Sequence, residues 1–403
     1  MRIHMIGIGG IGMSALAQLY VHEGTHVSGS DKEASPTTQL LEKKGVHVSI
    51  GQKAENVPTD VDLVVYSDAV WNDNPERMRA KELGLKEISY FEALGGVAKG
   101  KRTIAVTGTH GKTTTSALIA KILKDAGKEP TAIIGSIVPE FGSNFLAGKS
   151  DIFVVEACEY RNHFLRFHPD ILVVTNMEWD HTDFFKSFDE MKKAFEEARG
   201  QAKTVIDAGV YKSETVPVLQ LIGDFNMMNA RAAKAAVRAA FPDIPDPAID
   251  SSLAAFTGTW RRFEIKGATE EGALVVDDYA HHPGAISATL KAAREKFPDK
   301  TLVVAFHPHL YSRTRDLMED FAKAFTDADE VLLAPIYPAR EEPIEGVTSE
   351  ALAKRIVANG KHAEALPSLD AVEAELKARS APETVLITMG AGDIYKVADA
   401  LIK

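Results

Sequence analysis

A glycine-rich turn after residue 107 holds the residues with the clearest chemistry. Its glycines would let backbone N–H groups approach phosphate oxygens, and a helix starting there adds the positive end of its dipole. Lys112 can neutralise the β and γ oxygens of a nucleoside triphosphate, and the hydroxyl of Thr113 can bind Mg²⁺. The general phosphate-loop spacing would place a glycine at Val106, so this is a shorter form of the motif. The loop consists of Gly108, Thr109, His110, Gly111, Lys112, Thr113 and Thr114.

A second glycine motif lies close to the N-terminus. Gly7, Gly9 and Gly12 separate an apolar run from a helix-like segment, and Asp31 follows roughly twenty residues later. This is the fingerprint of a dinucleotide-binding domain, so a nicotinamide-dependent oxidoreductase is one interpretation of the chain. That interpretation leaves the phosphate loop unexplained, together with the acidic and histidine-containing segments farther along.

Short apolar runs that alternate with helix-like segments must position these motifs. Apolar runs of this kind are typical of strands buried in parallel sheets, and their alternation with helices favours an α/β fold. We expect a Rossmann-like domain at 1–100, a central P-loop ATPase-type parallel sheet at 101–257 and a second Rossmann-like domain at 258–403. The expected strands are 2–6, 26–30, 62–66, 103–107, 151–155, 171–175, 273–276, 301–306, 330–334 and 384–389, and the expected helices are 12–23, 112–126, 226–241 and 283–296.

Length and composition restrict the class of protein. A chain of 403 residues is too long for one hydrophobic core, which agrees with several domains. The net charge of −11 argues against a nucleic-acid-coating surface, whose signature is a clustered basic excess. The single cysteine, Cys158, provides no disulfide framework and suits a reducing compartment. Because the longest apolar runs fall short of about 18 residues, we expect no membrane insertion and a cytoplasmic protein.

The chain resembles the Mur ligase family over nearly its whole length. The phosphate loop has the short Gly-Thr-His-Gly-Lys-Thr form that this family carries. Residues 7–14 resemble the family's nucleotide-sugar loop, and residues 156–160 and 175–181 resemble its Mg²⁺ segments. Residues 226–230 resemble the start of its adenine-binding helix. In the third unit the matching segments are 261–264, 277–283, 307–314 and 389–393.

The resemblance implies an ATP-dependent amide-bond ligase. The γ-phosphoryl group of ATP would convert the carboxylate of UDP-N-acetylmuramate into an acyl phosphate, which the amine of L-alanine then attacks. Residues 156–165 look more like the L-alanine-adding branch of the family than the branch that recycles a murein tripeptide onto the same nucleotide sugar, which is the alternative. A non-catalytic descendant would have lost Lys112, Thr113 or Glu156, and all three are present.

The resemblance also implies a role for each candidate site residue. Lys112, His181, His281 and Arg313 would act in catalysis, with Arg313 able to pair with the alanine carboxylate through two hydrogen bonds. Thr113, Glu156 and His181 would bind Mg²⁺. ATP would contact the phosphate loop together with Asn226, Asn229, Arg262 and Asp278. The nucleotide sugar and L-alanine would contact Gly9, Gly10, Ile11, Gly12, Asp31, Ser67, Tyr279, His309 and Arg313.

Three features depart from the family pattern. Phe225 stands where a histidine usually precedes the first adenine-contacting asparagine, and Leu310 stands where some members carry arginine. The family also inserts a longer β-rich stretch between Val205 and Gly223. We interpret the shorter stretch as a trimmed peripheral sheet, because every phosphate and metal motif is retained.

Overall fold

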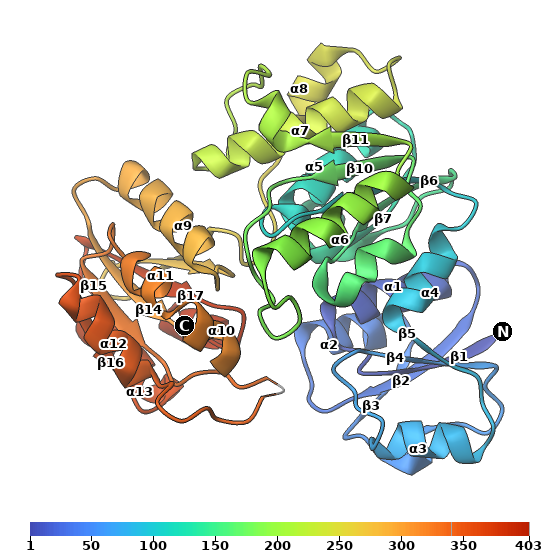
Figure 1. Cartoon of the computed structure of the whole chain (residues 1–403), viewed down its shortest axis with the longest axis horizontal. Coiled ribbons are helices and arrows are strands. Elements are labelled where there is room, and N and C mark those ends of the chain that lie inside the picture. Colours follow the sequence, from blue (N-terminus) through green and yellow to red (C-terminus); the bar gives the residue numbers. More distant parts are fainter. Residues whose placement is uncertain (340, 403) are drawn as a thin grey trace. The chain divides into compact units, whose positions relative to one another are not determined.

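The computed structural model describes residues 1–339 and 341–402, and it has the three-sheet α/β fold that the sequence predicts (Figure 1). The chain divides into two compact units. The first comprises Met1–Met177, Lys193–Val218 and Asn229–Thr257, and it contains the first two sheets. The second comprises Glu178–Lys192, Leu219–Met228 and Gly258–Lys403, and it contains the third sheet. Within the described residues, no helix is long and apolar enough to cross a membrane.

The N-terminal sheet is fully parallel, with the strand order β3-β2-β1-β4-β5. This order is that of a Rossmann-like sheet, whose ligands bind beyond the carboxyl ends of the strands. Ser35 and Ser89 form capping boxes that fix the starts of α2 and α4. The elements are β1 (Arg2–Ile6), α1 (Ile11–His22), β2 (His26–Asp31), α2 (Pro36–Lys43), β3 (His47–Ile50), η1 (Ala54–Asn56), β4 (Leu63–Tyr66), α3 (Pro75–Glu82), β5 (Glu87–Ser89) and α4 (Tyr90–Ala98).

The central sheet has the order β11-β10-β6-β9-β7-β8, and β8 alone runs antiparallel to its neighbour. The sequence did not predict this edge strand. A short turn ending at Gly142 joins β7 to β8, and such a connection permits only antiparallel pairing. The elements are β6 (Arg102–Thr107), α5 (Lys112–Asp125), β7 (Thr131–Val138), η2 (Pro139–Phe141), β8 (Ser143–Leu146), β9 (Ile152–Glu156), η3 (Tyr160–Arg166), β10 (Ile171–Val174), α6 (Phe188–Gln201), β11 (Thr204–Asp207), η4 (Ala208–Tyr211), α7 (Asp224–Ala240) and α8 (Asp246–Ala255).

The third sheet has the order β12-β13-β17-β14-β15-β16. Its edge strand β12 is antiparallel to β13, which the sequence also did not predict, and the other strands are parallel. The elements are β12 (Glu264–Ala268), β13 (Leu274–Asp278), α9 (Pro283–Lys296), β14 (Thr301–Phe306), α10 (Tyr311–Asp316), α11 (Met318–Lys323), β15 (Glu330–Leu333), α12 (Ser349–Ala358), β16 (His362–Ala365), α13 (Leu369–Ala378), β17 (Thr384–Met389) and α14 (Tyr395–Leu401).

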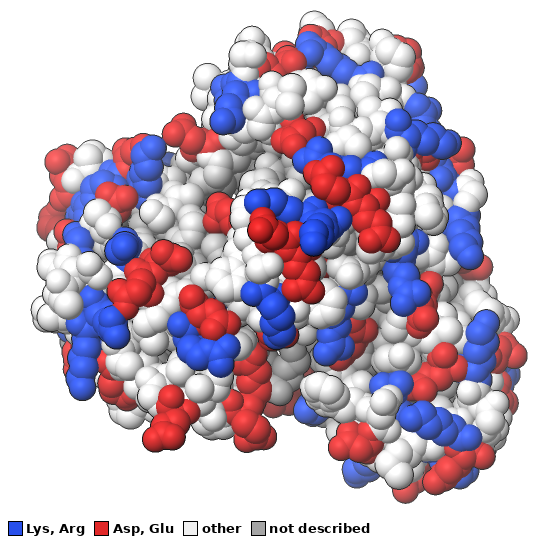
Figure 2. All heavy atoms as spheres, in the orientation of Figure 1, with Lys and Arg blue, Asp and Glu red and all other residues white. Residues whose placement is uncertain are grey.

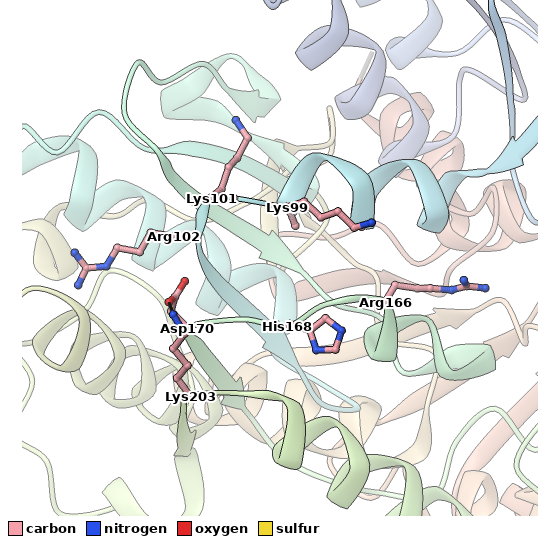
Figure 3. A pocket seen from close by; sticks show the side chains of 10 residues that line it. Lys99, Lys101, Arg102, Arg166, His168, Asp170 and Lys203 are labelled. Carbon is pink, nitrogen blue, oxygen red and sulfur yellow. Dashed lines mark hydrogen bonds and ion pairs between the residues drawn. The ribbon is translucent and has the colours of Figure 1, made fainter.

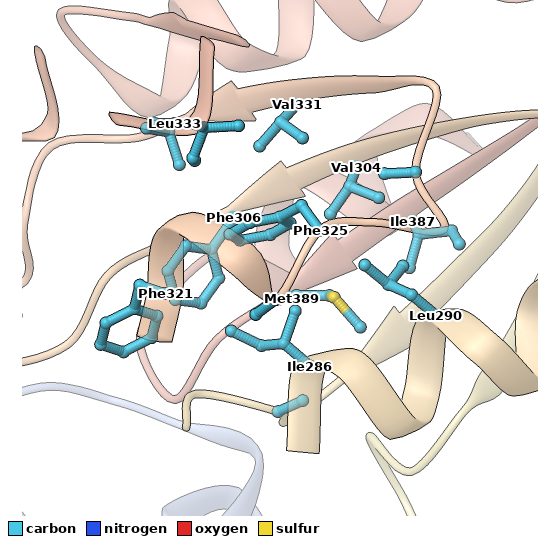
Figure 4. Close-up of a cluster of buried hydrophobic side chains, with 14 of the residues drawn as sticks. Ile286, Leu290, Val304, Phe306, Phe321, Phe325, Val331, Leu333, Ile387 and Met389 are labelled. Atoms are coloured by element: carbon cyan, nitrogen blue, oxygen red, sulfur yellow. The ribbon is translucent and has the colours of Figure 1, made fainter. Parts of the chain in front are cut away.

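One face of the third sheet is covered by an aromatic core. Figure 4 shows Phe306, Phe321 and Phe325 close together, with Ile286 of α9 and Met389 of β17 beside them. All five side chains are fully buried, and burying each contributes roughly 1.5–3 kcal/mol to the folded state. Trp179, distant in sequence, packs partly buried against the same cluster. This core fixes the strands whose carboxyl ends carry Asp278, His307 and Gly390.

Candidate functional site

The phosphate loop joins the end of β6 to the start of α5, as the sequence predicts. Residues after β10 hold it in place. The backbone N–H of His110 donates to Oδ1 of Asn176 at 2.9 Å, and the Thr175 hydroxyl donates to the His110 carbonyl at 2.5 Å. Thr109 donates its N–H to the Asn176 carbonyl, and Thr114 is buried in the first turn of α5. Thr175 and Asn176, which open the segment that resembles an Mg²⁺ segment, therefore hold the phosphate loop in place.

Gly111 is the residue of the loop that most clearly has to be glycine. It is the N-cap of α5 with φ +83°, a conformation that L side chains rarely adopt. An added Cβ would also collide with Oδ1 of Asn229, so the amide of Asn229 lies directly against the loop. The contact of Asn229 with adenine stays a prediction.

Lys112 is turned toward a buried carboxylate, Glu159. Its Nζ lies 3.0 Å from Oε2 of Glu159 and also donates to the backbone carbonyls of Gly108 and Thr109. Burial disfavours the ammonium, yet the negative charge of Glu159 raises the pKa of Lys112 above its usual value. The lysine is therefore protonated, as phosphate binding requires. Glu159 was missing from the predicted site, although the paired carboxylates Glu156 and Glu159 were a signal for it.

Thr113 and Glu156 come together where β6 and β9 end side by side. The Thr113 hydroxyl donates to Oε2 of Glu156 at 3.0 Å, and the N–H of Gly135 in β7 donates to the same oxygen at 3.0 Å. An added Cβ at Gly135 would collide with this carboxylate. A hydroxyl and a carboxylate are the hard oxygen ligands that Mg²⁺ prefers, so these two side chains fit such an ion.

The N-terminal glycine loop is held by a hydrogen bond to Asp31, the last residue of β2. Gly9 donates its N–H to Oδ2 of Asp31 at 2.8 Å, and Lys32 donates to Oδ1 at 2.7 Å. Gly10 is the N-cap of α1, and Ser67 lies against Gly7. In a dinucleotide-binding domain the acidic residue would contact ribose hydroxyls instead. Because Asp31 is bonded to the loop, the geometry disfavours the oxidoreductase interpretation.

The carbonyl of Ile11 connects this loop to the central sheet. It accepts a hydrogen bond from Nδ2 of the fully buried Asn144, which also donates to the Ser14 hydroxyl at 3.0 Å. Gln18 donates to Oδ1 of Asn144 at 2.9 Å and accepts from Ser143 at 2.8 Å. A buried polar network, which no local sequence pattern indicated, therefore joins the first turns of α1 to the strand β8.

In the second unit, Tyr279, His281, His309 and Arg313 gather as a cluster. The rings of His281 and His309 are 6.1 Å apart, and Arg313 donates from Nη1 to the carbonyl of His309 at 3.3 Å. Arg313 also donates from Nε to Oδ1 of Asp180 at 2.8 Å, and sequence reasoning missed this buried partner.

Electrostatics within the cluster favour a charged Asp180 and a neutral His281. Burial favours the neutral acid, yet the Arg313 guanidinium holds the pKa of Asp180 well below its usual range. Burial, together with the Arg313 charge, lowers the pKa of His281 well below its usual value. The Nδ1 atom of His281 lies 2.9 Å from the Tyr279 carbonyl, so the ring is oriented by the backbone of β13's C-terminal extension.

Arg261 and Arg262 are adjacent in sequence but make different contacts, a difference that the sequence did not indicate. Arg261 is buried, donating to Asp277 at 2.7 Å and to the carbonyls of Gly390 and Gly392 at 2.6 and 3.1 Å. The guanidinium of Arg262, the residue predicted to contact ATP, lies 4.9 Å above the Tyr279 ring. Arg261 therefore anchors the glycine turn after β17.

Asp278, the other residue of this unit predicted to contact ATP, has both carboxylate oxygens engaged. They accept the backbone N–H groups of Phe263 and Ala280, each at 2.7 Å. Burial raises its pKa above the ordinary value, although Arg262 opposes the shift.

The predicted metal ligands come from both units, and so do the two asparagines predicted to contact adenine. Whether each group forms one site therefore stays a prediction. Thr113 and Glu156 belong to the first unit and His181 to the second, where its backbone has φ +52°. Asn229 belongs to the first unit and Asn226 to the second, where the Asn226 amide donates to the carbonyl of Ile222 at 2.8 Å.

A cavity of about 500 Å³ lies away from these residues, beside the linker before β6 (Figure 3). Lysine and arginine side chains line it, but they do not converge. Lys203 is paired with Asp170 at 2.7 Å, and Figure 3 shows Lys101 and Arg102 extending in different directions. On the face shown in Figure 2, acidic and basic side chains are interspersed. The cavity thus lacks the focused charge of an anion site.

The fold and the site are those of an α/β protein that binds a nucleotide. Its sheets are mainly parallel, its phosphate loop follows a central strand, and a carboxylate ends the neighbouring strand. The chain belongs to the Mur ligase family. Residues 2–102 match the family model described as Mur ligase family, catalytic domain, residues 106–206 the Mur ligase middle domain, and residues 261–392 the Mur ligase, glutamate ligase domain.

Relatives match the chain from end to end. It is 38% identical to a UDP-N-acetylmuramate–L-alanine ligase of Acetivibrio thermocellus, covering 100% of this chain and 96% of that protein. A protein of the same name from Clostridium kluyveri is 36% identical, with 99% and 97% covered. The solved UDP-N-acetylmuramate-alanine ligase MurC of Thermotoga maritima superposes with a TM-score of 0.84 at 30% identity, covering 100% and 98%. A murein peptide ligase from Psychrobacter arcticus gives a TM-score of 0.74 at 25% identity, covering 100% and 98%.

Proposed function

We propose that the chain uses ATP to join L-alanine to the carboxylate of UDP-N-acetylmuramate, a step of peptidoglycan precursor synthesis in the cytoplasm. The observation that carries this proposal is the Thr113–Glu156 hydrogen bond of 3.0 Å beside Lys112, in a chain that aligns end to end with ligases of that name. We also propose the division into domains at 1–100, 101–257 and 258–403.

A free carboxylate is a poor acceptor for an amine, so the reaction first needs a leaving group on that carbon. Phosphoryl transfer from ATP provides it as an acyl phosphate, and such transfer depends on positioning and charge neutralisation. The N–H groups at the start of α5 would bind phosphate oxygens, and the Lys112 ammonium would move from Glu159 onto the β and γ oxygens. Thr113 and Glu156 would hold Mg²⁺, which supplies further positive charge when bound.

The amine component would be bound by the cluster in the second unit. Arg313 would bind the alanine carboxylate through guanidinium N–H groups that Asp180 and His309 leave available. His281 is neutral because burial lowers its pKa, so it is able to accept a hydrogen bond from the incoming amine. Tyr279 and His309 complete this side of the proposed site.

A phosphate-release assay with UDP-N-acetylmuramate, ATP, Mg²⁺ and a panel of amine substrates tests the proposal. We expect L-alanine to react fastest, glycine and L-serine more slowly, and D-alanine not at all. One methyl group distinguishes alanine from glycine by only about 1–3 kcal/mol. Preference for the murein tripeptide would overturn the choice of L-alanine, and tight NAD binding without nucleotide-sugar binding would overturn the ligase assignment.

Lys112→Ala provides the matching test of the phosphate loop. Removing a charge aimed at the developing phosphoryl charge should lower kcat by about 10²-fold or more while the protein stays folded. The exposed Lys149, replaced by alanine in the same way, should leave kcat unchanged. Near-normal turnover of folded Lys112→Ala protein would contradict the assignment.

A further inference from the structure

Tyr90 lies against the N-terminal glycine loop of the first unit. It is the first residue of α4, whose start is fixed by the reciprocal hydrogen bonds of Ser89 and Glu92. Its ring makes an edge contact with Phe91 at 4.7 Å, and Phe91 stacks on His163 at 3.6 Å. The aromatic ring is therefore held in place by packing rather than by its hydroxyl.

One side of the Tyr90 phenol faces the N-terminal glycine loop. A Cβ added to Gly12 would lie 2.5 Å from Oη of Tyr90 and 2.7 Å from Cζ. The phenol therefore lies against the backbone at the start of α1, where a nucleotide sugar's diphosphate would meet the helix N-terminus. This contact explains why residue 12 has to be glycine here.

The surroundings of Tyr90 favour the neutral form of its phenol. Burial raises the pKa of Tyr90, and the negative charge of Glu156 raises it further. The phenol is consequently protonated throughout the physiological range and acts as a hydrogen-bond donor. Tyr90 Oη makes no hydrogen bond to any residue within 1–339 and 341–402.

The N-terminal glycine loop and Glu156 both make hydrogen bonds to the same β-hairpin. Asn144 of β8 donates to the carbonyl of Ile11, next to Gly12. Strand β7, the hairpin partner of β8, carries Gly135, which donates its N–H to Glu156. The N-terminal glycine loop and the Glu156 carboxylate are thus connected through the β7–β8 hairpin.

We propose that Tyr90 donates its phenolic hydrogen to an anionic oxygen of the nucleotide sugar, on either its diphosphate or its muramyl carboxylate. This inference rests on the proposed function, because it needs a substrate that extends from the glycine loop toward Glu156.

Tyr90→Phe removes the hydroxyl and retains the ring that packs on Gly12 and Phe91. Calorimetry should show UDP-N-acetylmuramate binding weakened roughly ten- to a hundredfold, as expected for loss of a hydrogen bond to a charged group. Binding of a non-hydrolysable ATP analogue and the Tm should not change. Tyr20→Phe is the matched control, because Tyr20 is a buried tyrosine of α1 outside the proposed site, and it should bind both ligands normally.

Titration with UDP alone distinguishes the two oxygens. Weakened UDP binding by Tyr90→Phe would assign the bond to the diphosphate, and normal UDP binding with weakened nucleotide-sugar binding would assign it to the muramyl carboxylate. Unchanged nucleotide-sugar affinity in the variant, or a parallel loss of ATP-analogue affinity and Tm, would overturn the inference and leave the proposed function intact. Failure of the wild-type protein to bind the nucleotide sugar would instead overturn the proposed function.

Discussion

Arg313 donates from Nε to Oδ1 of Asp180 at 2.8 Å, with both side chains almost fully buried in the second unit. A carboxylate on one edge of a guanidinium fixes its plane and leaves the remaining N–H groups directed elsewhere. Asp180 is thus the residue that would aim Arg313 at a substrate carboxylate.

Asp180→Asn should therefore reduce both stability and alanine binding. Leaving Arg313 as an unpaired buried charge should lower the free energy of unfolding by about 3–5 kcal/mol. The KM for L-alanine should rise more than that for ATP, because only the former depends on the orientation of Arg313. Denaturant titration and steady-state kinetics measure the two effects. Glu319→Gln, which breaks the exposed pair with Arg355, is the control and should cost no more than about 1 kcal/mol. Equal changes in both KM values would contradict an orienting role.

Glu159→Gln should make the protein more dependent on bound nucleotide for its stability. The variant leaves the Lys112 ammonium without its buried counter-ion, so the Tm without ligand should fall. Phosphates would restore the charge pairing and no longer compete with Glu159, so the rise in Tm caused by an ATP analogue should exceed that of the wild-type protein. Glu129→Gln, at an exposed pair, should behave like wild type. An identical ligand-induced rise in Glu159→Gln would show that Glu159 does not compete for Lys112.

His307 should contribute a pH-dependent loss of stability in mild acid. Burial lowers the pKa of this side chain from 6.5 to about 4, so the unfolded chain binds more protons between these values. Stability from this group is present above pH 6.5 and falls as the pH drops toward 4, by at most about 3 kcal/mol. His307→Gln should flatten the slope of unfolding free energy against pH in this interval. The exposed His362, changed to glutamine, should leave the slope as it is; an unchanged slope in His307→Gln would contradict the prediction.

Gly111→Ala should distort the phosphate loop more than an equivalent change at a surface turn. Gly24 has nearly the same backbone angle, φ +78° against +83°, but an added Cβ there meets open space. Both alanines carry the strain of a left-handed backbone, of order 1 kcal/mol or more, whereas only Gly111→Ala also displaces Asn229. Chemical denaturation should show the larger loss for Gly111→Ala, and its KM for ATP should rise. Equal losses would show that Asn229 yields without cost.

Local patterns in the sequence were sufficient to predict most of the framework. The apolar runs gave β1, β6 and β14 within a residue of their observed ends, because buried parallel strands have little polar content. Lys112 and Thr113 were recognisable because a phosphate loop needs its residues at fixed spacing. The antiparallel strands β8 and β12 were missed, since edge strands lack such a distinctive pattern.

Contacts between residues that are far apart in the sequence could not be predicted from local sequence patterns. Asp180 and Arg313 are 133 positions apart, and no local pattern indicates that they pair with each other. The adjacent residues Arg261 and Arg262 have the same chemistry, and only packing shows that Arg261 is the buried one. Asp31 matched a nucleoside-binding motif, but the motif did not indicate that its carboxylate accepts a hydrogen bond from the N–H of Gly9.

The second unit consists of three separate segments of the chain, two of which, Glu178–Lys192 and Leu219–Met228, precede the segment that holds its sheet. Glu178–Lys192 belongs to this unit and carries both Trp179, which packs on its core, and Asp180. A gene fragment starting at residue 258 would encode the whole third sheet. It would lack Trp179, which packs against the aromatic cluster, and Asp180, which is the counter-ion of Arg313. On the ribosome, the two early pieces emerge long before the strands they pack against. Their contacts with the third sheet can form only after its strands have been synthesised.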